Sequence, residues 1–210
     1  MRWSMGLLSV AGLLMAACGG GNRGTTTGTA RTGQPAETAA APAGGATTTV
    51  ATGGGGGGAL TVPDWMKVDK SARTVSADVE AGKTPDNNHW NFNGYYNGNA
   101  TITVPVGYKV RIQFTNHDPA VPHSIGVDSR TGDFPPTFTN PQPVFRGAIS
   151  SNPTDPTKAT APGKSETISF TADKPGRYSL VCYQPGHAAA GMWVHFVVSQ
   201  EGQAGVSTGS

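Results

Sequence analysis

The stretch VCYQPGHAAAGMWVHF, residues 181–196, combines a strand-like pattern with three metal-binding side chains. It places Cys182, His187 and Met192 at five-residue steps within a loop rich in proline, glycine and alanine. Alternating apolar residues before and after the loop are typical of two β-strands. The stretch therefore predicts a strand, a loop and a second strand, with a thiol, an imidazole and a thioether at one end of a sheet.

The surrounding sequence has the pattern of an all-β domain. Residues 60–199 consist of short apolar runs separated by Pro, Gly and Asn, without helical periodicity of useful length. In GYKVRIQFTN, the polar residues Lys109, Arg111 and Gln113 alternate with apolar ones. Short alternating strands of this kind predict two packed sheets around a single core.

Other segments of the domain are less regular. Residues 90–94 have the composition of an early strand, and residues 128–163 form a long connection rich in Pro, Ser, Thr and Asn. Within that connection we expect one short strand, around residues 144–145. We expect residues 200–210 to be a flexible tail beyond the domain.

The cysteine, histidine and methionine of the loop together favour copper. A copper ion that exchanges one electron prefers two imidazoles and one thiolate, with a weak axial thioether. The second imidazole must come from elsewhere, and His123 in TNHDPAVPHSIGV is the first candidate, with His117 as a rival in a more polar turn. Taken singly, Cys182 is more typical of a small buried residue and Met192 of core filler. Their co-occurrence at regular spacing favours the metal site.

These residues carry a resemblance to a known family. The tripeptide PHS at residues 122–124, followed by Cys-x4-His-x4-Met, resembles the cupredoxins, which are small blue copper electron carriers. The resemblance covers about residues 88–198 and is strongest to the sulfocyanins, with the rusticyanins more distant. It implies a two-sheet Greek-key β-sandwich that holds one type 1 copper ion.

The resemblance also assigns roles to individual residues. It implies that His123, Cys182 and His187 are the equatorial copper ligands and that Met192 is the axial ligand. It further implies that Ser124 donates a hydrogen bond to the thiolate and that electrons enter or leave at His187. The apolar residues around His187 form the expected docking patch, namely Pro185, Gly186, Ala188, Ala189 and Ala190. With aromatic residues expected around the site (Phe92, Phe114 and Trp193), we predict a dry centre with a fairly high reduction potential.

The N-terminal part has the pattern of an export signal. Residues 1–17 contain Arg2 and then an apolar stretch too short to span a bilayer. The stretch ends in LMAAC, which resembles the lipobox of bacterial lipoproteins and predicts lipid attachment at Cys18. Residues 18–59 are mainly Gly, Thr, Ala and Pro, a composition that predicts a disordered tether. The domain is therefore expected outside the cytoplasm, lipid-anchored to a bacterial membrane on its periplasmic or extracellular side.

Charge and cysteine content exclude several classes of function. From Leu60 onward there are twelve Lys and Arg against twelve Asp and Glu, so no basic surface for nucleic acid is expected. The domain contains one cysteine and lacks His-x-His pairs, which argues against copper enzymes and binuclear copper centres. The sequence favours a monomeric one-electron carrier that is not an enzyme, and the resemblance implies a cytochrome or a terminal oxidase as its redox partner. The alternative is a copper storage or delivery lipoprotein, and an adhesion domain without copper is disfavoured by the intact ligand set.

Overall fold

The computed structural model describes residues 59–209, which form nine β-strands and one short 3-10 helix. The elements are β1 (Met66–Asp69), β2 (Thr74–Ala81), η1 (Asp86–His89), β3 (Ala100–Pro105), β4 (Lys109–Asn116), β5 (Gly126–Asp128), β6 (Ser165–Thr171), β7 (Gly176–Val181), β8 (Trp193–Ser199) and β9 (Gly205–Thr208).

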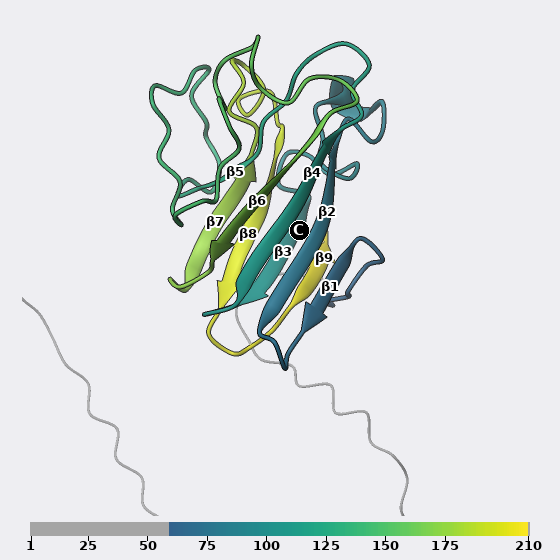
Figure 1. Ribbon diagram of the computed structural model, residues 1–210. Helices are drawn as coiled ribbons and strands as arrows, with labels where there is room; N and C mark the ends of the chain where they lie inside the picture. The colour runs from purple at the N-terminus through teal and green to yellow at the C-terminus, as the bar shows by residue number, and fades with distance from the viewer. Residues whose placement is uncertain (1–58, 210) are drawn as a thin grey trace, which may run out of the picture. The chain divides into compact units, whose positions relative to one another are not determined.

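The strands form two sheets, as the sequence pattern predicts. One sheet has the order β1-β2-β4-β6 and the other the order β5-β7-β8-β3-β9 (Figure 1). Strand β2 runs parallel to β4, and β3 runs parallel to β8, so residues far apart in sequence become neighbours. The predicted all-β fold of two sheets is confirmed.

The core lies between the sheets and follows from strand alternation. In β4, Val110, Ile112 and Phe114 are buried while Lys109 and Arg111 are exposed, because successive side chains of a strand point to opposite faces. This agrees with the alternation predicted for this segment.

Three sequence-based predictions about secondary structure were wrong. The segment predicted as a flexible tail, residues 200–210, contains strand β9, which pairs with β3, and Val206 also pairs with Thr61 at the start of the domain. No strand forms around residues 144–145, where Val144 donates a single backbone hydrogen bond to Val127. Residues 90–94 contribute only isolated bridges through Phe92.

One end of the sandwich carries the long connections. The connection from β5 to β6, the loop between β7 and β8, and η1 all lie at this end (Figure 1). Since residues 182–192 are in the β7–β8 loop, the predicted metal ligands of that loop lie at this end as well.

Among residues 59–209 there is no helix long and apolar enough to cross a membrane. The predicted signal peptide, the lipidation site Cys18 and the tether up to residue 58 lie outside the described residues.

Candidate metal centre

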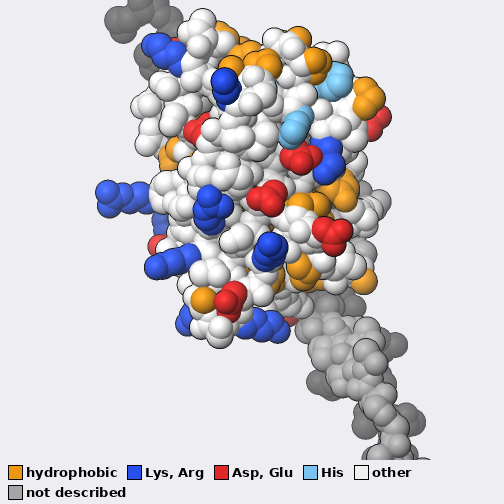
Figure 2. Space-filling view, turned by 45° about the vertical axis from the view of Figure 1, so that its right-hand side comes forward, with side chains coloured by type: hydrophobic (Ala, Val, Ile, Leu, Met, Phe, Trp, Pro, Cys, Tyr) orange, Lys and Arg blue, Asp and Glu red, His pale blue; other side chains and the backbone are white. Residues whose placement is uncertain are grey.

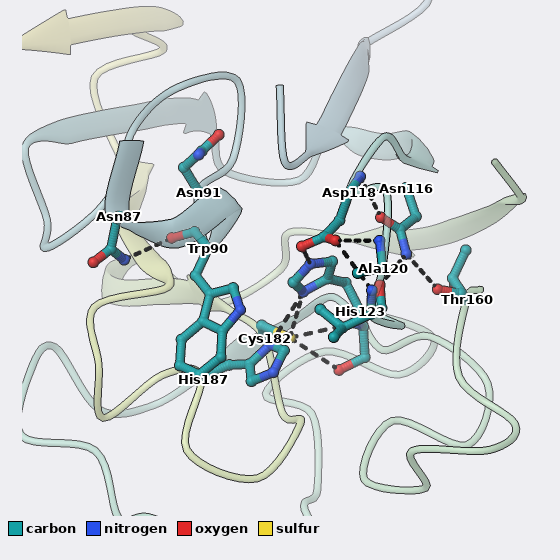
Figure 3. Close-up of polar contacts among 12 residues, drawn as sticks. Asn87, Trp90, Asn91, Asn116, Asp118, Ala120, His123, Thr160, Cys182 and His187 are labelled. Atoms are coloured by element: carbon teal, nitrogen blue, oxygen red, sulfur yellow. Dashed lines mark hydrogen bonds and ion pairs between the residues drawn. The ribbon is translucent and has the colours of Figure 1, made fainter. Parts of the chain in front are cut away.

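Three predicted ligands come together at this end of the sandwich. The ligand atoms of His123, Cys182 and His187 all lie within 4.8 Å of one another, and all three residues are buried. The Cys182 Sγ lies 3.4 Å from Nδ1 of His187 and 3.8 Å from Nδ1 of His123 (Figure 3). The two Nδ1 atoms are 3.1 Å apart. Both imidazoles therefore turn Nδ1, the ring nitrogen nearer the backbone, toward the sulfur.

The fourth predicted ligand is tied to the other two loop ligands through the backbone. Met192 is fully buried and directly precedes β8. Its N–H donates to the carbonyl of His187 at 2.9 Å, and its carbonyl accepts from the N–H of Cys182 at 3.1 Å. These bonds fold the loop back on itself, so residues ten positions apart reach the same site. Gly191, at φ +102°, permits this return, because a Cβ there would collide with Asn97.

Asp118 orients His123, a role that the sequence reasoning missed. Its Oδ2 lies 2.9 Å from Nε2 of His123, and its Oδ1 accepts hydrogen bonds from the N–H groups of Ala120 and Val121 at 2.8 and 3.0 Å. Since an ionised carboxylate only accepts, Nε2 of His123 carries the proton and Nδ1 presents its lone pair to the site. Asp118 was hidden because the sequence TNHDP reads as a solvated turn, whereas Asp118 is buried.

The thiol sulfur accepts hydrogen bonds from Ser124. The Ser124 N–H lies 3.4 Å from Sγ and the Ser124 Oγ lies 3.7 Å from it. The Ser124 Oγ also accepts the N–H of Tyr183 at 2.9 Å, so its own proton is free to point at the sulfur. The geometry thus matches the hydrogen bond expected for Ser124.

Burial sets the protonation of the ligands. It raises the pKa of the Cys182 thiol to about 11, against the lowering effect of the Ser124 hydrogen bonds. Burial, with a smaller effect of the nearby His123, lowers the pKa of His187 to about 4. Burial also lowers the pKa of His123, although Asp118 opposes that shift. At neutral pH both imidazoles are therefore uncharged and available as ligands, while the thiol needs a metal to lose its proton.

An aromatic ring covers the loop histidine. The indole of Trp90 stacks on the imidazole of His187 with ring centroids 4.0 Å apart and an interplanar angle of 19° (Figure 3). His187 is only 7% exposed as a result of this and its other contacts. The sequence analysis treated residues 90–94 as an early strand and did not connect Trp90 with the site.

The profile of the sulfocyanin (SoxE) domain matches residues 63–207, more than half of the chain. This chain belongs to the sulfocyanin family. The predicted resemblance to sulfocyanins is thereby confirmed.

Relatives of this sulfocyanin-family chain are distant in sequence. Sulfocyanin from Sulfolobus acidocaldarius is 29% identical over 133 residues, which cover 61% of this chain and 65% of that protein. This chain thus spans slightly less than two thirds of the curated relative's length. Reduced auracyanin from Roseiflexus castenholzii is 28% identical with a TM-score of 0.41, covering 59% of this chain and 96% of that one. Rusticyanin is 26% identical with a TM-score of 0.41, covering 65% of this chain and 88% of that one.

The residues of the sulfocyanin-family site fit copper. His123, Cys182, His187 and Met192 are arranged as a type 1 copper site. The lone pairs of two neutral imidazoles and a thiol converge in a buried space, an arrangement that is satisfied by a cation between them. A thioether beside two imidazoles and a thiolate suits copper better than zinc, since zinc gains little from a soft axial ligand.

Some predicted surroundings of the sulfocyanin-family site are corrected by the structure. Ala188 does not belong to an exposed patch: it is 1% exposed and packs with Phe134 and Tyr183. Trp193 lies away from the core face, against Phe134 and His195, because it alternates with the buried residues of β8. Its expected place at the site is taken by Trp90.

The rival histidine lies apart from the site. His117 has a half-exposed side chain, and its Nε2 is 3.9 Å from Glu80 Oε1. This agrees with the solvated turn expected for His117.

Proposed function

We propose that this sulfocyanin-family chain is a one-electron carrier whose copper ion alternates between Cu(I) and Cu(II). The observation that carries the proposal is a set of His123, Cys182, His187 and Met192 that is buried and already in place. Burial leaves no ligand atom open to a substrate, which favours electron exchange over catalysis and argues that the chain is not an enzyme. A sealed site also disfavours the storage or delivery alternative, which needs ready exchange of the metal.

When bound, the copper ion would supply a centre that accepts or gives up one electron. The residues of the chain do the rest. Asp118 keeps the Nδ1 lone pair of His123 available, and Ser124 stabilises negative charge on the Cys182 sulfur through its N–H and hydroxyl. Since these groups are fixed by hydrogen bonds to the backbone, they need little movement when the charge of the centre changes by one.

The proposed partner is another redox protein, such as a cytochrome or a terminal oxidase. Pro185, Ala189 and Ala190 are exposed around the loop, and Gly186 is partly exposed. Figure 2 shows apolar side chains gathered at the upper end of the domain and charges of both signs dispersed over its sides. A small apolar contact of this kind supports brief and weak docking rather than a stable complex.

The proposed location is the outer side of a bacterial membrane. The sequence of residues 1–17 favours export, LMAAC favours lipid attachment at Cys18, and the composition of residues 18–59 favours a flexible tether. Such a tether would let a lipid-anchored domain reach partners held in the same membrane.

The test is the visible spectrum of the purified full-length chain after addition of one equivalent of copper(II). The expected result is an intense thiolate-to-copper band that ascorbate bleaches and an oxidant restores over repeated cycles without loss of copper. Cys182→Ala should abolish the band, and a coloured Cys182→Ala protein would overturn the ligand assignment. A wild-type protein that binds copper but fails to cycle would favour storage or delivery.

A further inference from the structure

The segment that precedes Trp90 has an unusual backbone. Asn87, Asn88 and His89 have φ values of 50°, 57° and 64°, which places three successive residues other than glycine in the left-handed region. Residues with side chains visit this region singly rather than in runs, because Cβ crowds the following carbonyl. Strain of this kind persists where surrounding contacts enforce it, and it is concentrated at functional sites.

Side-chain amides enforce this backbone on both sides of Trp90. Asn87 Nδ2 donates to the carbonyl of Trp90 at 2.8 Å. Asn91 is wholly buried, and its Nδ2 donates to the carbonyls of Thr84 and Asp86 at 2.8 and 2.9 Å. The residues before and after Trp90 are therefore fixed, and the position of the indole follows from theirs.

This strained and fixed segment places the indole of Trp90 against the imidazole of His187. The indole lies over one face of the imidazole, as Figure 3 shows, while His123 meets the ring of His187 at 61° with centroids 4.9 Å apart. Trp90 is itself only half-buried, whereas the imidazole beneath it is buried. The indole thus separates the ligand ring from solvent on this side.

We propose that Trp90 is a positioning residue of the copper centre: its stacked indole holds the His187 ring in the ligating orientation in both oxidation states. Copper(I) tolerates fewer and softer ligands than copper(II), so an imidazole on a surface loop is the ligand most easily lost on reduction. Rotation of the His187 ring away from the metal would require it to leave the face of Trp90. The stack therefore opposes the movement that would make electron exchange slow.

The experiment compares three variants of the full-length protein loaded with copper(I). Trp90→Leu removes the stacking ring but keeps an apolar side chain, Trp90→Phe keeps a smaller ring, and Trp65→Ala changes a partly buried tryptophan that packs against the main core on the β1 side. The first readout is the rate at which a copper(I) chelator removes the metal. The second is the electron self-exchange rate, which is the only readout that rests on the proposed function.

Trp90→Leu is expected to lose copper(I) up to about tenfold faster than wild type, the upper end of what an aromatic pair contributes. Its self-exchange should slow, while Trp90→Phe should stay close to wild type in both readouts. Unchanged copper loss in Trp90→Leu would overturn the proposal, and so would equal acceleration in Trp65→Ala, which would indicate general destabilisation. If Trp90→Leu does not fold, Trp90→Met replaces it as the variant without a ring: faster copper(I) loss than in Trp65→Ala supports the proposal, and copper(I) loss no faster than in Trp65→Ala overturns it. A wild-type protein without a copper band would instead refute the proposed function.

Discussion

Copper binding to this protein is expected to release one proton at neutral pH, and that proton should come from Cys182. Burial raises the pKa of the Cys182 thiol to about 11, so the metal-free site holds a thiol, whereas the bound metal requires a thiolate. The imidazoles contribute no proton, since burial lowers the pKa of His187 to about 4 and also lowers that of His123.

The magnitude follows from proton linkage. From about pH 7 to pH 10 the logarithm of the apparent copper affinity should rise by one for each pH unit, which is about 1.4 kcal/mol per unit. The sign is positive because a higher pH favours the thiolate that the metal needs. Above pH 11 the metal-free thiol is already ionised and the slope should vanish. Below about pH 4 the slope should steepen, because His187 must then lose a proton as well.

Calorimetric titration in two buffers of different ionisation enthalpy counts the protons released per copper. We expect a value close to one at pH 7.5, and a value close to zero for Cys182→Ala. A wild-type value of zero would mean that the metal-free thiol is already ionised, and a value of two would mean that one histidine is protonated. Either result would refute the account of burial given for these ligands.

Three substitutions test the hydrogen bond, the backbone turn and the core packing that support the metal site. Asp118→Asn should weaken copper binding about 10- to 100-fold in a chelator competition, because the carboxylate that fixes the His123 ring is lost. The partly exposed Asp155 forms an ion pair with Lys158, and Asp155→Asn should leave copper binding unchanged. Gly82→Ala should lower both the melting temperature and the copper affinity, since Gly82 has a φ of +69° and a Cβ there would lie 2.7 Å from the Asp118 nitrogen. Phe114→Ala should reduce the free energy of unfolding in urea by about 3–5 kcal/mol, because Phe114 is fully buried in the core.

The predictions that the structure confirms are those that depend on patterns within one short segment. The alternation in residues 107–116 predicts β4 because it depends on a period of two within one strand. The five-residue spacing predicts the loop ligands because Cys182, His187 and Met192 belong to a single turn of chain. Strand β9 escaped notice because residues 205–208 contain a single large apolar residue, and their pairing with β3 depends on a distant partner.

Contacts between distant segments account for the rest. Trp90 meets His187 across 97 positions of sequence, and no periodicity links the two segments. Ala188 looked exposed in a loop of small residues, but Phe134 and Phe138 of the long β5–β6 connection pack over the cluster that contains it. The course of that connection is set by tertiary packing, since it has no repeating pattern of its own.

Two buried asparagines explain how irregular segments hold a metal centre steady. Asn116, beneath Asp118, donates from Nδ2 to the carbonyls of Val121 and Thr160 and accepts the Asp118 N–H at Oδ1. Asn91, beside Trp90, makes the same three kinds of bond to backbone groups of its own segment. The side-chain amides of Asn91 and Asn116 thus bond backbone groups that have no strand partner. These hydrogen bonds do not require the metal. Asp118, which contacts His123, and Trp90, which stacks on His187, are therefore fixed without the metal. We expect these two residues to move little when the charge of the copper centre changes by one.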